Sequence, residues 1–168
     1  PVAHFVSLWR SEATARLMAL RPVIVRGNAS EIIALSGAEA AGQGADSGDD
    51  VTAAEGPARA LARASGAVVA VTGVRDFVTD GERAVRVSGG HALMPKVTAL
   101  GCALTALTGA YAAQESAFDA AAAALAHYGA AGERAGAAAT HPGSFAVAFL
   151  DALSAVGPVD LDGRVEAA

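Results

Sequence analysis

Apolar residues recur at helical spacing near the start of the chain and then form two short, continuous runs. The spacing over residues 8–20 predicts a helix, which Pro22 ends because a residue before proline is pushed out of the α region. The runs 23–25 and 67–71 consist largely of β-branched residues. Such runs are typical of strands that are covered on both faces.

Polar and glycine-rich segments separate these apolar elements. Residues 27–30 form a turn that leads into a helix. Residues 37–50 are acidic and rich in glycine, and we interpret them as an exposed loop within one domain. A helix over 51–64 follows, and Gly66 is expected to be its C-cap.

The second half of the chain predicts a hairpin followed by helices. Asp80-Gly81 separates two short apolar segments, at 77–79 and 84–87, as in a β-hairpin. Three helices are expected after it, the last of them capped by Ser144, and the tail from Gly157 is weakly specified. The alternation of strands and helices favours an α/β sheet with helices on its faces. The expected helices are 101–113, 116–139 and 143–156.

Composition narrows the classes of function. The chain has 168 residues, 53% hydrophobic and 17% charged, which fits a single domain over 1–168. A net charge of −5 argues against a nucleic-acid or anionic-membrane partner. The single cysteine suits a reducing, cytoplasmic compartment. No apolar run reaches the ~18 residues of a membrane span, and no signal peptide is recognisable.

The first candidate for chemistry is the segment Val25–Glu31, where a strand ends and a helix begins. Sheets of this class bind ligands at such ends, and a helix N-terminus presents free N–H groups to an anion. Arg26 adds a charge that can bind phosphate oxygens, and Glu31 could hold Mg²⁺. The structural alternative is that Asn28 or Ser30 caps the helix and Glu31 complements its dipole.

Two weaker candidates follow the second strand. Thr72-Gly73, with Asp76 and Thr79-Asp80-Gly81 after it, could place a hydroxyl against a phosphate, although the same residue types are common in ordinary turns. Cys102 lies in the first turn of a predicted helix, where a thiolate is stabilised. Its alternative role is that of a small buried hydrophobe.

Together these segments resemble the hydroxyethylthiazole kinase family, and the resemblance covers nearly the whole chain. The run from Pro22 to Ile32 contains the family's RGNASEI signature, and residues 69–81 are similar to its VTG and VTDG block. Residues 90–102 resemble the block that ends in VTGTGC. Residues 142–145 and 150–153 match its C-terminal GPGSF and LDAL segments.

The resemblance implies a ribokinase-like fold, here without its N-terminal part. It implies transfer of the γ-phosphate of ATP, with Mg²⁺, to the hydroxyl of 4-methyl-5-(2-hydroxyethyl)thiazole in thiamine salvage, by a homotrimer with sites at subunit interfaces. The roles that it implies are contacts with ATP and its metal, a contact with the thiazole, and a catalytic position otherwise held by aspartate. The resemblance assigns ATP contacts to Arg26, Asn28 and Thr72, the metal to Glu31, the thiazole contact to Ala99 and the catalytic position to Cys102.

The sequence also departs from the family pattern. The family's Gly-Thr-Gly-Cys turn is replaced by Ala99-Leu100-Gly101-Cys102, and an alanine is costly where a positive φ is needed. Pro1–Ser7 lack the two glycines of the family's DPVGxGAT segment, and the acidic residue expected before Pro1 is absent. Three hypotheses therefore stand: a thiazole kinase, a catalytically impaired nucleotide-binding relic of the same fold, and a kinase for another small alcohol.

Overall fold

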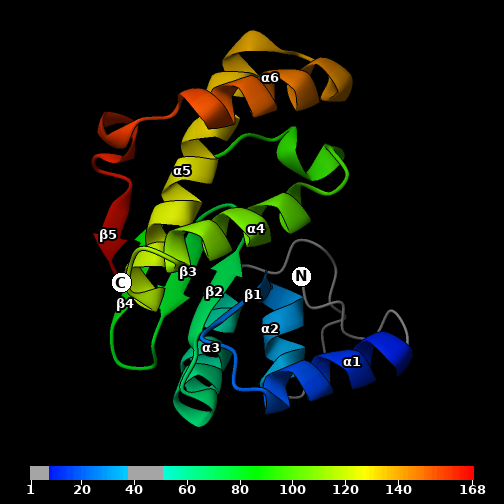
Figure 1. The fold of residues 1–168 in the computed structure, drawn as a ribbon, viewed down its shortest axis with the longest axis vertical. Coiled ribbons are helices and arrows are strands. Elements are labelled where there is room, and N and C mark those ends of the chain that lie inside the picture. Colours follow the sequence, from blue (N-terminus) through cyan, green and yellow to red (C-terminus); the bar gives the residue numbers. More distant parts are fainter. Residues whose placement is uncertain (1–7, 38–50) are drawn as a thin grey trace. The chain divides into compact units, whose positions relative to one another are not determined.

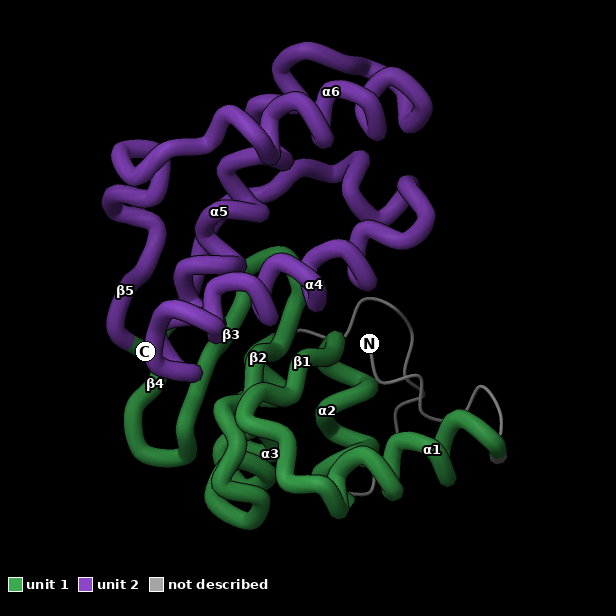
Figure 2. Tube along the Cα trace, viewed as in Figure 1, with its two compact units in different colours: residues 1–85, 168 green, residues 86–167 purple. Residues whose placement is uncertain are grey.

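A computed structural model describes residues 8–37 and 51–168 (Figure 1). The chain divides into two compact units, residues 1–85 with Ala168, and residues 86–167 (Figure 2). The expected loop over 37–50 and the segment Pro1–Ser7 lie almost wholly outside the described residues. The interpretation of 1–168 as one domain stays a prediction.

The chain has an α/β fold with a mixed sheet, as the sequence predicts. The strands are hydrogen-bonded in the order β1-β2-β3-β4-β5. The helices are α1 (Leu8–Ala19), α2 (Ala29–Leu35), α3 (Val51–Ser65), α4 (Leu100–Ala112), α5 (Ala117–Ala138) and α6 (Pro142–Ala155), and the strands are β1 (Ile24–Asn28), β2 (Val68–Thr72), β3 (Asp76–Thr79), β4 (Ala84–Val87) and β5 (Val165–Ala167).

The core of the first unit forms where α2 and α3 pack against β1 and β2. Helix α3 buries one side at a spacing of three to four residues, from Val51 to Ala62. Gly66 follows that helix with φ +73° and donates its N–H to Ala62 O at 2.8 Å, so the predicted C-cap is confirmed. Strand β2 is buried from Val68 to Val71, as its continuous apolar run predicts.

The second unit is a helical layer in which α5 packs against α4 and α6. Its core joins small residues of α5 to a group of aromatic rings. The rings of Phe145 and Phe149 have centroids 5.9 Å apart, and Tyr128 meets Phe149 edge-on at 4.7 Å. Gly129 lets the backbone of Gly89 approach closely, because a Cβ at either position would lie 3.1 Å from the other's Cα.

Three details of the sequence interpretation are wrong. Strand β1 continues through Gly27-Asn28, which the sequence predicted as the start of a turn. The N-cap of α6 is His141, without a side-chain cap bond, and the Ser144 hydroxyl donates instead to the carbonyl of His141 at 3.0 Å. The tail contains a short helix at Pro158–Leu161 and strand β5, neither of which its sequence predicted.

Candidate active site

The candidate site of the first unit lies where β1 and β2 end together. These strands are parallel, and their register pairs Gly27 with Val71 and Asn28 with Thr72. Parallel strands bring their carboxyl ends to the same edge of a sheet (Figure 1), so the two segments singled out in the sequence meet there. In this register Asn28 and Thr72 lie side by side at the ends of their strands, and Arg26 lies two residues earlier on β1.

Arg26 and Thr72 are joined through their side chains at this edge. Nη1 of Arg26 donates to Oγ1 of Thr72 at 3.3 Å, and the Thr72 hydroxyl donates to the carbonyl of Gly27 at 3.2 Å. Both side chains are half-buried. The hydroxyl proton is therefore directed at the backbone of β1, and the guanidinium presents a positive charge beside the strand end that an anion could bind.

Asn28 and Glu31 form a reciprocal cap at the start of α2. Oδ1 of Asn28 accepts from the backbone N–H of Glu31 at 2.8 Å, and Oε2 of Glu31 accepts from the N–H of Asn28 at 2.9 Å. This is the capping box that stabilises helix N-termini. The structural alternative for Asn28 is therefore confirmed, with Asn28 rather than Ser30 as the N-cap.

Glu31 fits a metal only as one ligand among several. Within residues 8–37 and 51–168, no group of three or more His, Cys, Asp or Glu residues is placed to hold a metal ion. Mg²⁺ is usually held by one or two carboxylates together with phosphate oxygens and water, so a single carboxylate near a phosphate site is compatible with it. One of the two Glu31 oxygens already accepts the Asn28 N–H.

The turn after β2 contributes a carboxyl group that the sequence suggested only as turn chemistry. Oδ1 of Asp76 accepts from the backbone N–H of Gly73 at 2.8 Å. Burial raises the pKa of Asp76 to about 7, although the Gly73 hydrogen bond and the charge of Arg26 act in the opposite direction. Asp76 therefore belongs to the same group as Arg26 and Thr72. The spacing of Gly73 and Asp76, three residues apart, was the signal in the sequence.

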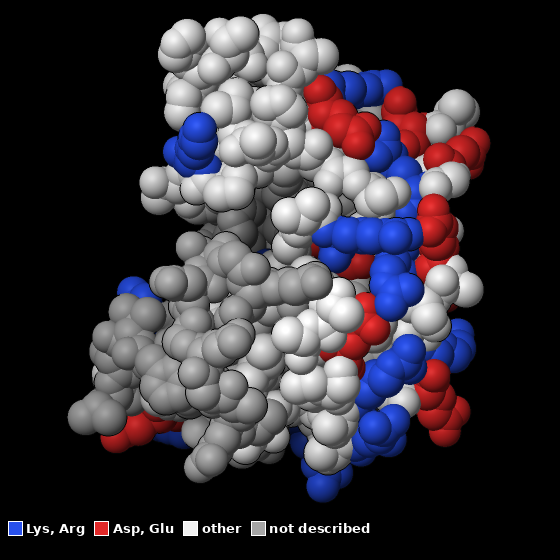
Figure 3. Space-filling model, turned by 180° about the vertical axis from the view of Figure 1, so that it is seen from behind, with Lys and Arg blue, Asp and Glu red and all other residues white. Residues whose placement is uncertain are grey.

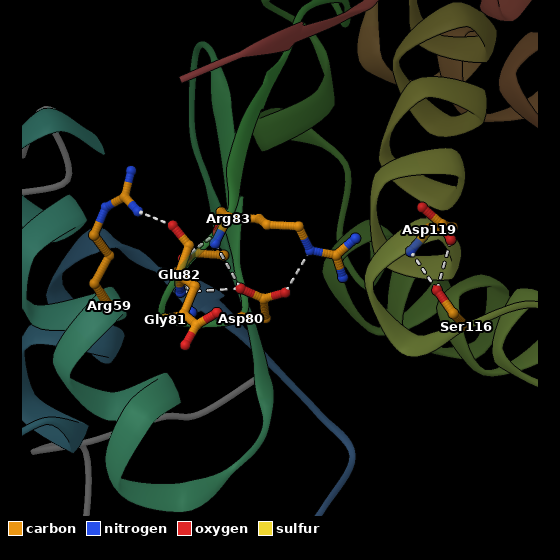
Figure 4. Close-up of polar contacts among 8 residues, drawn as sticks. Arg59, Asp80, Gly81, Glu82, Arg83, Ser116 and Asp119 are labelled. Atoms are coloured by element: carbon orange, nitrogen blue, oxygen red, sulfur yellow. Dashed lines mark hydrogen bonds and ion pairs between the residues drawn. The ribbon is translucent and has the colours of Figure 1, made fainter.

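Thr79-Asp80-Gly81 does not belong to this site. Strand β3 is antiparallel to β2, and its register pairs Thr79 with Val69, at the amino end of β2. The Thr79 hydroxyl is fully buried and donates to the carbonyl of Arg83 at 2.7 Å. These residues form the β3–β4 turn, in which Asp80 also pairs with Arg83 at 2.8 Å (Figure 4). The interpretation as ordinary turn chemistry is therefore confirmed.

Helix α3 holds this β3–β4 turn through two arginines. Nη1 of Arg63 donates to the carbonyl of Gly81 at 2.7 Å. Nη1 of Arg59 donates to the carbonyl of Glu82 at 3.2 Å (Figure 4). The Arg59 guanidinium also lies over the ring of Phe77, 5.4 Å from its centroid. The turn is thus a structural feature of the first unit, at the edge opposite to Arg26.

The second unit carries the altered turn at the start of α4. Ala99 is the N-cap of α4 and has φ 70° and ψ 1°, in the left-handed region. The condition under which an alanine is costly is therefore met at this position, and Ala99 is strained. Cys102 lies in the first turn of α4 and is exposed, so it is not the buried hydrophobe of the alternative interpretation. Tyr128 supports the turn from α5 by donating to the carbonyl of Leu100 at 2.6 Å.

Charges of both signs lie side by side on the surface drawn in Figure 3. Ion pairs in the described part of the chain include Arg134 with Asp160 at 2.5 Å and Arg164 with Glu133 at 2.7 Å. Within the described ranges 8–37 and 51–168, no helix combines the length and the apolar character needed to cross a membrane.

The fold places the chain among α/β proteins that gather polar groups at the carboxyl edge of parallel strands. A family model described as the hydroxyethylthiazole kinase family matches residues 1–158. The chain belongs to the hydroxyethylthiazole kinase family, as its motifs indicated.

Individual relatives agree with this family. The chain is 61% identical to a hydroxyethylthiazole kinase of Cereibacter sphaeroides (strain ATCC 17025 / ATH 2.4.3), over 100% of its own length. It is 60% identical to that of Rhizobium leguminosarum bv. trifolii (strain WSM2304), over 98% of its length. A solved structure of the hydroxyethylthiazole kinase protein from Pyrococcus horikoshii OT3 superimposes with a TM-score of 0.83 at 31% identity, over 96% of the chain.

The chain spans only part of each of these proteins. It covers 65% of the Cereibacter protein, 62% of the Rhizobium protein and 60% of the Pyrococcus chain.

Proposed function

We propose that this chain supplies the nucleotide-binding part of a kinase that transfers the γ-phosphate of ATP to the hydroxyl of 4-methyl-5-(2-hydroxyethyl)thiazole, with Mg²⁺. In this reaction the hydroxyl oxygen of the thiazole forms a bond to the γ-phosphorus, and the bond between that phosphorus and the oxygen bridging it to the β-phosphate breaks, so that ADP leaves. The hydroxyl proton passes to solvent. Membership of the family supports the reaction class. The proposal extends to thiamine salvage, a cytoplasmic location and a homotrimer.

The observation that carries the proposal is the hydrogen bond from Arg26 to Thr72 at the joint end of β1 and β2. Phosphoryl transfer depends mainly on positioning and on charge stabilisation around the phosphates. A guanidinium that is oriented by a neighbouring hydroxyl suits that task, because its N–H groups are held in place before the ligand arrives. Arg26, Asn28 and Thr72 are assigned to ATP in this proposal, and Glu31 to Mg²⁺.

The second unit supplies the remaining assignments. Ala99 is assigned to the thiazole, and Cys102, at the first turn of α4, to the position of the catalytic aspartate of related kinases. Both residues lie within one turn of a helix N-terminus, where developing negative charge is stabilised. The exposure of Cys102 is compatible with contact to a ligand.

A second candidate function is that of a nucleotide-binding relic with impaired catalysis. The left-handed backbone of Ala99 favours it, because a turn that suits glycine here contains alanine and is followed by the bulky Leu100. Donors that stabilise a transition state must be placed accurately, and losing one commonly costs ~10²–10³ in rate. The two candidates share nucleotide binding and differ in turnover.

Calorimetric titration with ATP and Mg²⁺, followed by a coupled assay with the thiazole, tests the proposal. Arg26→Ala should weaken ATP binding about tenfold or more, the worth of one charged hydrogen bond. Arg59→Ala is the matched control, because Arg59 also donates to an oxygen at 3.2 Å in the same unit, but at the other turn. Equal affinities of wild type and Arg26→Ala would overturn the proposal. Binding without turnover would favour the relic.

A further inference from the structure

A carboxyl group bridges the turn between β2 and β3. Residues 73–75 are exposed, and the side chain of Val74, at the centre of the turn, is 98% exposed. Val74 therefore contributes almost no buried apolar area to fix the backbone. The bond from the Gly73 N–H to Oδ1 of Asp76, at 2.8 Å, connects the end of β2 to the first residue of β3.

This bond acts directly on Thr72. The N–H of Gly73 lies in the same rigid peptide plane as the carbonyl of Thr72, so holding it restricts rotation about the Cα–C bond of Thr72. The Thr72 hydroxyl in turn accepts from Arg26 and donates to Gly27. Asp76 is therefore connected to the guanidinium of Arg26 by the Gly73 hydrogen bond, the covalent link from Gly73 to Thr72, and the hydrogen bond between Thr72 and Arg26.

Arg26 also interacts with Asp76 through its charge. The positive charge of Arg26 lowers the pKa of Asp76 against the larger effect of burial, so the two groups are close enough to influence each other. The carboxyl group therefore supports the phosphate-binding edge in two ways, as a hydrogen-bond acceptor for the turn and as a partial counter-charge for the arginine.

We propose that Asp76 is a positioning residue of the nucleotide site: its carboxyl oxygen fixes the Gly73 peptide and thereby orients Thr72 and Arg26 toward the phosphates of ATP. This inference rests on the proposed function, since it concerns the same edge of the sheet. It assigns to Asp76 a role in affinity and not only in the stability of a turn.

Two substitutions separate these effects. Asp76→Ala removes the acceptor, leaves the Gly73 N–H without it and frees the turn. Asp76→Asn keeps an oxygen at the same distance from the backbone but carries no charge. Because the protonated carboxyl is already well populated near neutral pH in the fold, the amide is a close mimic of a state that the protein adopts.

Asp80 provides the matched control. It follows β3 at its other end and also accepts backbone N–H groups, from Arg83 at 2.8 Å and from Glu82 at 3.0 Å. Asp80→Ala therefore removes the same kind of turn-fixing carboxyl from the same strand, at the edge away from Arg26. A merely structural role of Asp76 would give Asp76→Ala and Asp80→Ala the same phenotype.

The test is calorimetric titration of the complete chain and its variants with ATP and Mg²⁺, with thermal unfolding measured in parallel. We expect Asp76→Ala to weaken ATP binding about tenfold, the worth of one hydrogen bond, and Asp76→Asn to remain within about threefold of wild type. Asp80→Ala should lower the unfolding midpoint and leave the affinity unchanged. If Asp76→Ala does not fold, Asp76→Glu replaces it, because its longer side chain displaces the acceptor and should also weaken binding.

The outcomes are distinct. If Arg26→Ala loses affinity while Asp76→Ala, or Asp76→Glu in its place, binds as wild type does, the positioning role is overturned and the proposed function stands. If Asp80→Ala loses as much affinity as the Asp76 variant, general destabilisation explains both and the positioning role is again overturned. If the wild type does not bind ATP, the proposed function itself fails, and this inference fails with it.

Discussion

A Cβ atom built on Gly73 would lie 2.4 Å from Cγ2 of Val51, the first residue of α3. Val51 is buried, so it has little freedom to move away. The glycine of the Val-Thr-Gly motif is therefore required because a side chain would clash with Val51, and not because the backbone has a positive φ. It lets the N-terminus of α3 pack directly against the end of β2.

Gly73→Ala should consequently destabilise the protein by about 1–3 kcal/mol, the usual cost of overpacking. Chemical denaturation measures the change. Combining it with Val51→Ala should recover part of the loss, because the clashing methyl group is removed. Gly109→Ala is the control, since a Cβ at Gly109, inside α4, meets nothing within 4 Å and should stabilise the helix by roughly 0.5–1 kcal/mol. A Gly73→Ala variant as stable as wild type would contradict this account.

Ala99→Gly should stabilise the chain. The left-handed backbone destabilises a residue with a Cβ by about 1–2 kcal/mol. Removing the Cβ should therefore recover part of that free energy of unfolding. Ala106→Gly, at an exposed position within the same helix, should instead destabilise by about 1 kcal/mol. Unfolding curves of the two variants should therefore shift in opposite directions, and a loss of stability in both would show that Ala99 is not strained.

Asp76 should make stability depend on pH in a defined direction. Its pKa is about 7 in the fold against an ordinary value of 3.8, so between these values the native state holds a proton that the unfolded chain has released. Its contribution is therefore complete below about pH 4 and is lost as the pH rises through about 7. Asp76→Asn removes this dependence. As the pH rises from about 4 to about 7, the free energy of unfolding of Asp76→Asn should increase relative to that of wild type. The increase should be at most a few kcal/mol, since one pKa unit is about 1.4 kcal/mol.

Asp80→Asn should show the opposite dependence. Partial burial raises the pKa of Asp80, but hydrogen bonds from the Arg83 side chain and from the backbone outweigh it, and the pKa lies below its ordinary value. Wild type should therefore lose its advantage over Asp80→Asn as the pH falls. Denaturation series at matched ionic strength, from pH 3 to pH 9, compare both variants with wild type. The same slope in both would contradict the assignment.

Turnover of hydroxyethylthiazole should be low in this chain and should rise when Ala99→Gly is combined with Leu100→Thr. Glycine relieves the strain at φ 70°, and threonine restores a hydroxyl at the start of α4. Misplacement of one donor commonly costs ~10²–10³ in rate, so the increase can be large. A coupled assay with ATP and Mg²⁺ measures it. Turnover in the ordinary range of the family by the unaltered chain would contradict the expectation.

The sequence predicted the buried strands and the long helices well, because both depend on apolar periodicity. It missed the continuation of β1 through Arg26-Gly27-Asn28, since these residues have low strand propensity and only pairing with β2 keeps them extended. It also missed β5, whose three residues are all exposed and too few to show a periodic apolar pattern.

The site could be predicted only as far as local motifs reach. Arg26 and Thr72 were found because each follows an apolar strand. The exclusion of Thr79 depends on the antiparallel direction of β3, which spacing along the chain does not reveal. The sequence drew attention to Asp76 but did not predict its contact with the candidate site, because an aspartate three residues after a glycine is common in turns that bind nothing.

The two arginines that reach from α3 to the β3–β4 turn also have a consequence for local opening. Each donates to a main-chain oxygen of the turn, and the turn cannot leave the helix without breaking both bonds. Segments tied in this way unfold as one cooperative unit, which hydrogen exchange detects as a shared opening free energy. The backbone amides of Gly81 and Arg83 should therefore exchange at the pace of α3, far more slowly than a surface turn of four residues would on its own.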